Sequence, residues 1–253
     1  MTVSVEKRER LALITIDRPP LNVLDLQILR DLDRVLTAVS REPSVDVLVL
    51  QGGGQGAFSA GVDIRDHTKE KVPEMLDIVH GAIRKLLSLP QVTIASIRGL
   101  CLGGGCELAS SCDLLIAAED SSFATPEIRV GCYPPVALAR FSSLLGYRRA
   151  AEMILTGRRF SAQEALAMGL VNRVVANDDL QKGLESLVDE LLGKSGAVLR
   201  ITLRGLREIS LSGFSDALKR AEEIYCQQLL QTEDVEEGVQ AFLQKRKPSW
   251  THK

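Results

Sequence analysis

Short apolar runs alternate with amphipathic stretches along the first 120 residues of the chain. Residues 11–17 (LALITID), 45–50 (VDVLVL) and 92–97 are the short, β-branched runs that are typical of buried strands. After Asp25, which can cap a helix, apolar side chains at helical spacing predict a helix. Its apolar face consists of Ile28, Leu32, Val35, Leu36 and Val39. Residues 73–89 predict a second helix. Strands that alternate with helices predict an α/β core.

The pattern changes toward the second half of the chain. Residues 99–112 predict a glycine-rich turn that leads into a small-residue helix, and residues 113–117 are again strand-like. Residues 178–247 are a succession of helical patterns with a weak β-signal. In the last of them, residues 232–247, acidic side chains precede basic ones, which suits the helix dipole. The apolar stripe of this helix is Val235, Val239 and Phe242. The pattern fits a helix packed on a neighbouring subunit and fits a layer on the chain's own core equally well.

Composition and charge exclude several classes of protein. The chain has 253 residues, of which 45% are hydrophobic and 25% charged, and a net charge of −2, so its surface is not a nucleic-acid footprint. No apolar run approaches the roughly 20 residues that cross a bilayer. The N-terminal residues lack the succession of basic, apolar and small residues that marks a secretion signal, so we expect a cytoplasmic protein. Five cysteines without a CxxC pair, together with three histidines, predict neither a disulfide framework nor a metal site.

The residues available for chemistry narrow the choice further. A Ser–His–Asp triad needs a histidine on a scaffold, and His67, His80 and His252 lie in a polar loop, a helix and the tail. The glycine clusters at residues 52–56 and 99–107 match neither of the common nucleotide-phosphate loops. The triplet at 103–105 stands between a strand and a helix, where it either leaves backbone N–H groups open to a ligand or allows close packing of helix on sheet.

Two carboxylates stand out against this background. Glu107 lies in a small and apolar stretch (GGGCELASS), one helical turn after the glycines, and Glu127 follows a proline in ATPEIRVG. Either residue alone is more often a capping or surface carboxylate. Together with a glycine turn that can stabilise an oxyanion, the pair indicates general acid–base catalysis.

Three segments resemble consecutive signatures of the enoyl-CoA hydratase (crotonase) superfamily, in order and at its usual separations. They are FSAGVDIRD (58–66), IRGLCLGGGCELASSCD (97–113) and FATPEIRVG (123–131). Two further segments, 155–175 and 237–250, look like later landmarks of that superfamily. The resemblance therefore covers nearly the whole chain.

The resemblance implies a fold, an assembly and a site. The fold is a spiral of ββα units in an α/β core at residues 1–190, followed by a helical trimerisation region at 191–253, in homotrimers or homohexamers. The backbone N–H groups of Val62 and Gly104 would form the oxyanion hole, and Glu107 and Glu127 would be the catalytic pair. The CoA moiety would lie along the first loop, through the backbone of Ala60, Val62, Asp63 and Ile64. The implied activity is hydration of an α,β-unsaturated acyl-CoA, with no metal and no cofactor beyond the CoA of the substrate.

One position departs from the pattern of the hydratases. They usually carry a glycine eight residues after the second glutamate, whose N–H helps to hold the attacking water, whereas this chain has Pro135, which has no N–H. Proline also suits the first turn of a helix. The segments RPPLN (18–22) and PPVA (134–137) look like the branch that hydrates cyclohexa-1,5-diene-1-carbonyl-CoA.

Several alternatives stay open. The acyl group cannot be read from the sequence, because residues 66–80 and 129–142, which we expect to line its pocket, vary within the superfamily. Another reaction of the superfamily, such as double-bond isomerisation or decarboxylation, is the main alternative to hydration. A non-catalytic or RNA-binding relative is disfavoured by the intact glycines and by the lack of a basic, aromatic-interleaved surface.

Overall fold

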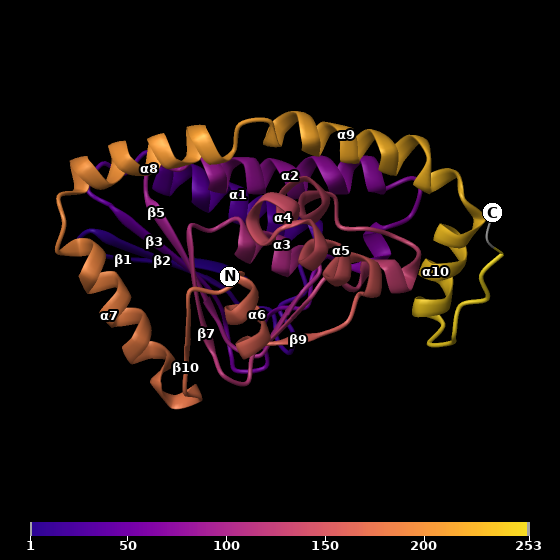
Figure 1. Cartoon of the computed structure of the whole chain (residues 1–253), viewed down its shortest axis with the longest axis horizontal. Coiled ribbons are helices and arrows are strands. Elements are labelled where there is room, and N and C mark those ends of the chain that lie inside the picture. Colours follow the sequence, from indigo (N-terminus) through magenta and orange to yellow (C-terminus); the bar gives the residue numbers. More distant parts are fainter. Residues whose placement is uncertain (1, 252–253) are drawn as a thin grey trace.

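The chain is described by a computed structural model over residues 2–251, in which two sheets and a set of helices form a mixed α/β fold (Figure 1). The larger sheet has the order β1-β2-β3-β5-β7-β10 and is parallel apart from the β1–β2 pair. Its strands are β1 (Val3–Arg8), β2 (Leu11–Ile16), β3 (Val47–Gly52), β5 (Val92–Ile97), β7 (Leu114–Ala118) and β10 (Arg173–Val175). The smaller sheet has the order β4-β6-β8-β9, with β4 (Ala57–Ser59), β6 (Leu100–Leu102), β8 (Ser122–Ala124) and β9 (Phe160–Ser161).

The chain builds these sheets by repetition, as the expected spiral of ββα units requires. The strands β3, β5 and β7 each lie in the large sheet, and each is followed by a short strand, β4, β6 or β8, in the small sheet. A helical segment closes each unit: α2 (Val72–Ser88) after β4, α3 (Gly104–Ser110) after β6, and α4 (Pro135–Leu145) after β8. The predicted fold class is therefore confirmed.

Most of the predicted elements are present with small changes at their ends. The first helix, α1 (Leu26–Ser40), begins after Asp25, whose side chain accepts a hydrogen bond from the backbone N–H of Ile28 at 2.9 Å. All six residues of β5 are buried, as expected for a strand that is covered on both faces. The short strand β6 was not expected, because the whole of residues 99–112 was interpreted as a turn and a helix.

Beyond β10 the described chain contains only helical segments. The α-helices are α7 (Leu180–Leu192), α8 (Gly196–Ser210), α9 (Phe214–Gln227) and α10 (Glu233–Leu243). Figure 1 shows α8 and α9 one after the other along one long side of the molecule, with α7 and α10 at opposite ends. The apolar stripe of α10 is divided, since Val235 is part of the chain's own core and Val239 is buried, whereas Phe242 is exposed. The alternative in which the last helix forms a layer on its own core is therefore correct for this helix.

The small sheet determines where a site can form. Because β4, β6 and β8 are parallel neighbours, the segments that follow them emerge at the same edge of the sheet. These segments are residues 60–63, the glycines at 103–105, and residues 125–131. Each of these segments lies within one of the three signatures, 58–66, 97–113 and 123–131. No helix within residues 2–251 is long and apolar enough to cross a membrane.

Candidate active site

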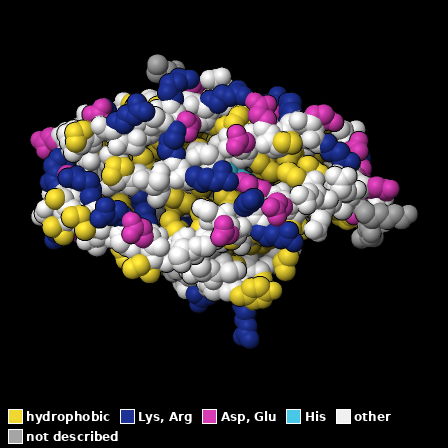
Figure 2. Space-filling model, turned by 90° about the horizontal axis from the view of Figure 1, so that it is seen from above, with side chains coloured by type: hydrophobic (Ala, Val, Ile, Leu, Met, Phe, Trp, Pro, Cys, Tyr) yellow, Lys and Arg dark blue, Asp and Glu magenta, His cyan; other side chains and the backbone are white. Residues whose placement is uncertain are grey.

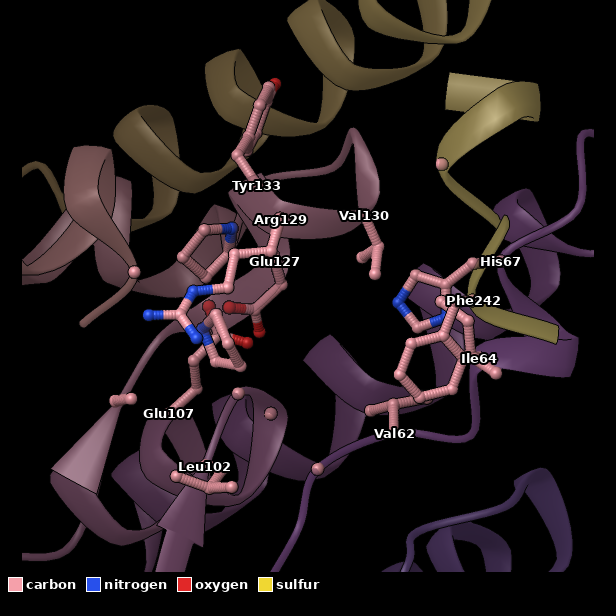
Figure 3. A pocket seen from close by; sticks show the side chains of 18 of the residues that line it. Val62, Ile64, His67, Leu102, Glu107, Glu127, Arg129, Val130, Tyr133 and Phe242 are labelled. Atoms are coloured by element: carbon pink, nitrogen blue, oxygen red, sulfur yellow. The ribbon is translucent and has the colours of Figure 1, made fainter. Parts of the chain in front are cut away.

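A pocket opens at this edge of the small sheet and encloses about 370 Å³ (Figure 3). Its inner walls are largely apolar, and α2, α9 and α10 complete them. Apart from the predicted site residues, the lining includes His67, Met75, Leu76, Val79, His80, Leu102, Tyr133, Tyr225 and Phe242. Residues from both 66–80 and 129–142 are among them, as the sequence predicted. An apolar pocket that contains a few polar groups is the usual form of a site for a small-molecule ligand.

Two residues that line this pocket, Val62 and Gly104, have backbone N–H groups without a partner in the described part of the chain. Gly104 is the first residue of α3, where a helix has no internal acceptor for its N–H group. Val62 follows Gly61, whose carbonyl accepts from Leu24, and Asp63 donates back to the carbonyl of Leu24. Within residues 2–251, neither the N–H of Val62 nor that of Gly104 donates to an acceptor of the protein. Two free donors in one pocket are the geometry of an oxyanion hole.

The glycines keep this space open. Gly103 has a φ of +54°, and a Cβ there would lie 2.7 Å from Oε1 of Glu127. A Cβ at Gly104 would lie 2.7 Å from Cγ2 of Val62. Larger residues at either position would therefore press on a predicted catalytic group. At Gly103 and Gly104, therefore, the lack of a side chain keeps space for a ligand. At Gly105 a Cβ would lie 2.7 Å from Ser59 of the sheet, so this third glycine allows close packing of the helix on the sheet.

Glu107 is held rigidly in the wall of the pocket. It lies on α3, is 3% exposed, and its Oε1 accepts a hydrogen bond from the backbone N–H of Ala137 at 3.0 Å. Burial raises the pKa of its carboxyl group, while a proton on His80 and the N–H groups of Ala137 and Val136 oppose that rise. The bond from Ala137 fixes one oxygen and leaves the other for the pocket.

Glu127 has a different environment, although its carboxyl group lies beside that of Glu107 (Figure 3). It belongs to a single 3₁₀ turn, Pro126–Val130, and no protein group within the described residues pairs with its buried Oε2. Burial, and secondly the negative charge of Glu107, raise its pKa to about 8. Two neighbouring carboxyl groups in different environments are suited to separate roles as acid and base. At neutral pH Glu127 carries the proton.

The structure brings most of the predicted site residues around this one pocket. Its lining includes Ala60, Val62, Ile64, Gly104, Glu107, Glu127 and Pro135. Asp63 is not part of the lining, since its buried carboxylate caps the next turn and binds the guanidinium of Arg65. Pro135 is the first residue of α4 and also lines the pocket, so both interpretations of this proline apply. The catalytic and CoA-binding roles of these residues stay predictions.

Sequence reasoning missed several polar groups of the pocket. His80 lies on the buried face of α2, and its Nδ1 donates to Oε1 of Glu222 on α9 at 2.6 Å. Tyr225 packs edge-on against Tyr133 with ring centroids 5.0 Å apart. A histidine on the apolar face of a helix was the one available signal, whereas nothing near Glu222 or Tyr225 in the sequence points to a site.

Comparisons with known proteins match this chain to enoyl-CoA hydratases over nearly its whole length. The model of the enoyl-CoA hydratase/isomerase family matches residues 6–253. A probable enoyl-CoA hydratase of Mycobacterium bovis is 33% identical over 255 residues, which cover 100% of this chain and 98% of that protein. A cyclohexa-1,5-dienecarbonyl-CoA hydratase of Thauera aromatica is 29% identical over 253 residues, covering 100% and 97%. The crystal structure of an enoyl-CoA hydratase from Mycobacterium avium subsp. paratuberculosis superposes with a TM-score of 0.90 at 28% identity, over 99% of both chains.

Proposed function

Since this chain belongs to the enoyl-CoA hydratase/isomerase family, whose members include hydro-lyases, we propose that it adds water reversibly to an α,β-unsaturated acyl-CoA thioester. One observation carries the proposal: two buried carboxyl groups and two free backbone N–H groups face the same apolar pocket. This set of groups suits a reaction in which negative charge develops on a thioester oxygen while protons move nearby.

The oxyanion hole activates the substrate. The thioester oxygen accepts hydrogen bonds from the N–H groups of Val62 and Gly104, so electron density that arrives at the α-carbon is delocalised onto that oxygen. Each donor of this kind contributes about 10²–10³ in rate. The CoA moiety leaves the pocket along the loop after β4, past the backbone of Ala60 and Ile64, and its acyl chain points toward the apolar wall.

The two glutamates move the protons. Glu107 accepts a proton from water as the water oxygen bonds to the β-carbon. Glu127, which is protonated at neutral pH, gives its proton to the α-carbon as the enolate collapses. Each turnover thus transfers one proton from water to Glu107 and one from Glu127 to product, and the pair is reset when the protons equilibrate with solvent. An absorbance assay on straight-chain and cyclic enoyl-CoA thioesters tests the proposal.

For the acyl group, we propose a flat, cyclic dienoyl thioester such as cyclohexa-1,5-diene-1-carbonyl-CoA. Pro134 and Pro135 lie in the pocket wall with the edge-to-face pair of Tyr133 and Tyr225, and rigid rings suit a planar ligand better than a flexible chain. The similarity to the dienecarbonyl-CoA hydratase of Thauera aromatica supports the same substrate class.

Kinetics on two substrates check this choice. We expect kcat/KM to be higher for cyclohexa-1,5-diene-1-carbonyl-CoA than for crotonyl-CoA. Pro135→Gly should reduce the difference in kcat/KM between the two substrates, because it restores an N–H and removes the ring. As a matched control, Pro43→Gly changes an exposed turn proline outside the pocket and should leave the ratio of the two substrates unchanged. A wild-type enzyme that prefers crotonyl-CoA would show that Pro135 acts only at the helix start.

We further propose that α8 holds the chain in a trimer or a pair of trimers. This helix exposes large apolar side chains that cover nothing in the described chain: Val198, Ile201, Leu206 and Ile209, which are between 60% and 79% exposed. Figure 2 shows hydrophobic side chains among charged ones on the face that α8 and α9 form. Several large apolar side chains exposed on one helix are a feature of interfaces between proteins.

Light scattering tests the assembly. We expect the mass of a trimer or hexamer for the wild type and a smaller species for the double variant Ile201→Glu with Ile209→Glu, because two buried charges would have to be desolvated at the interface. Val5→Glu, on the edge strand β1, is the control and should leave the mass unchanged. A monomeric wild-type protein at assay concentration would contradict the proposal.

A further inference from the structure

A histidine that the hydration scheme does not use lies in the wall of the pocket. His80 is 1% exposed, and the bond from its Nδ1 to Oε1 of Glu222 spans α2 and α9. Because an ionised carboxylate only accepts hydrogen bonds, Nδ1 carries the hydrogen. The hydrogen bond from His80 lowers the pKa of Glu222 and keeps it ionised. Its other nitrogen, Nε2, makes no hydrogen bond within residues 2–251.

The ring of His80 shares the pocket with both glutamates. His80 and Glu107 line the same pocket, and His80 lies near enough to act on the pKa of the Glu107 carboxyl group, which it lowers. No group within residues 2–251 makes a hydrogen bond to Nε2 of His80 or to Oε2 of Glu107. Neither atom is among the fully enclosed polar atoms without a partner, so both are open to the pocket, where a bound molecule can donate to them.

The chain also needs a substitute for a water-binding group. Pro135 has no N–H, and the next N–H groups of α4 are turned to the carboxylate of Glu107, with Ala137 donating to Oε1 at 3.0 Å. A water molecule in such a site requires two to four polar partners, of which Glu107 and Glu127 can supply two. A further acceptor would complete its binding.

We infer that His80, oriented by Glu222, is a catalytic residue that holds the reacting water together with Glu107, in place of the N–H that Pro135 lacks. One hydrogen of the water is donated to Oε2 of Glu107 and the other to Nε2 of His80. This leaves a lone pair of the water oxygen directed at the β-carbon. When the C–O bond forms, the first hydrogen moves to Glu107 as a proton and the second stays on the new hydroxyl group. This inference rests on the proposed hydration.

A purely structural role for His80 makes a different prediction. Glu222 also accepts from Arg84 on α2 at 2.7 Å, so the same carboxylate joins the two helices through a second residue. Arg84 is not part of the pocket lining and its side chain is 42% exposed. If His80 only ties α2 to α9, then changing Arg84 and changing His80 should have similar effects on stability and activity.

Two substitutions of His80 separate its two nitrogens. His80→Asn places an amide near Nδ1, so it keeps a donor for Glu222 and loses the group at Nε2. His80→Gln extends an amide to the place of Nε2, where its oxygen can accept from water. We expect His80→Asn to lower kcat for hydration about 10²-fold with KM near that of the wild type, because the water loses its orientation. We expect His80→Gln to recover part of kcat, and Arg84→Gln to retain the wild-type value.

A second reaction isolates the water step. Exchange of the α-hydrogens of butyryl-CoA in D₂O, followed by mass spectrometry, requires the oxyanion hole and Glu127 but no water addition. We expect His80→Asn to exchange at the wild-type rate while it hydrates slowly. Hydration by His80→Asn at the wild-type rate, parallel loss of exchange and hydration, or an equal loss in Arg84→Gln would each overturn the role of His80. A wild-type enzyme that hydrates none of the thioesters would instead overturn the proposed function, and the role of His80 with it.

Discussion

Glu127→Gln is expected to lower kcat for hydration about 10²-fold or more, because the amide keeps the shape of the side chain but cannot supply a proton to the α-carbon. Glu107→Gln should have a loss of similar size, since it removes the acceptor of the proton from water. Glu119→Gln, a change of an exposed carboxylate outside the pocket, is the matched control and should leave kcat unchanged. Wild-type turnover in both pocket variants would refute the assignment of the pair.

The pH dependence of the wild type tests the same roles. Since the pKa of Glu127 is raised to about 8, hydration should be constant near neutral pH and should fall as pH rises through about 8, where this acid loses its proton. The folded state also binds this proton at a higher pH than the unfolded state, whose carboxyl has a pKa near 4.5. Stability should therefore decrease as pH rises across that window, and Glu127→Gln should lack this component. An unchanged pH profile in Glu127→Gln would contradict the assignment.

The second large effect concerns the N–H of Gly104. Gly104→Pro removes this donor and should abolish turnover, and proline is tolerated at the first residue of a helix, so α3 can still form. The proline ring, however, would also meet Cγ2 of Val62, which lies 2.7 Å from the place of a Cβ at this position. Steric and electrostatic effects therefore have to be separated.

A smaller residue at position 62 separates them. Val62→Ala alone should be mild, because its contribution to the oxyanion hole comes from the backbone. In the Val62→Ala background, Gly104→Ala retains the N–H and Gly104→Pro lacks it, while both add carbon atoms at the same place. We expect the proline variant to be about 10²–10³-fold slower than the alanine variant, which is the effect of one oxyanion donor. Circular dichroism checks that both are folded, and equal rates would exclude a role for this N–H.

The sequence predicted the fold and the catalytic pair because their signals are local. The strand–helix alternation, the cap at Asp25 and the glycines before Glu107 each occupy a few consecutive residues, and the family resemblance gave their order in space. The strand β6 was missed because it has only three residues and runs directly into the glycine turn. Short strands of this kind are defined by their neighbours in the sheet, here β4 and β8, rather than by their own composition.

The remaining part of the pocket depends on contacts between distant segments. The pair of His80 and Glu222 joins residues that are 142 positions apart, and no periodicity indicates that α9 would place a carboxylate beside α2. At Asp63 the sequence did not indicate the backbone partner, since its N–H donates to the carbonyl of Leu24, and its predicted contact with CoA stays a prediction. Pro135 illustrates why one residue supports two interpretations: it begins α4, and that same position forms part of the pocket wall.

The central claim is that Glu107 and Glu127, in one pocket with the oxyanion hole, add water to an enoyl-CoA. It is tested most directly by following the absorbance of cyclohexa-1,5-diene-1-carbonyl-CoA and crotonyl-CoA with the wild-type protein and with Glu127→Gln, and by identifying the product by mass spectrometry. The account predicts a product heavier by one water with the wild type, and a rate at least about 10²-fold lower with the variant. A product of unchanged mass, or equal rates for the two proteins, would contradict it.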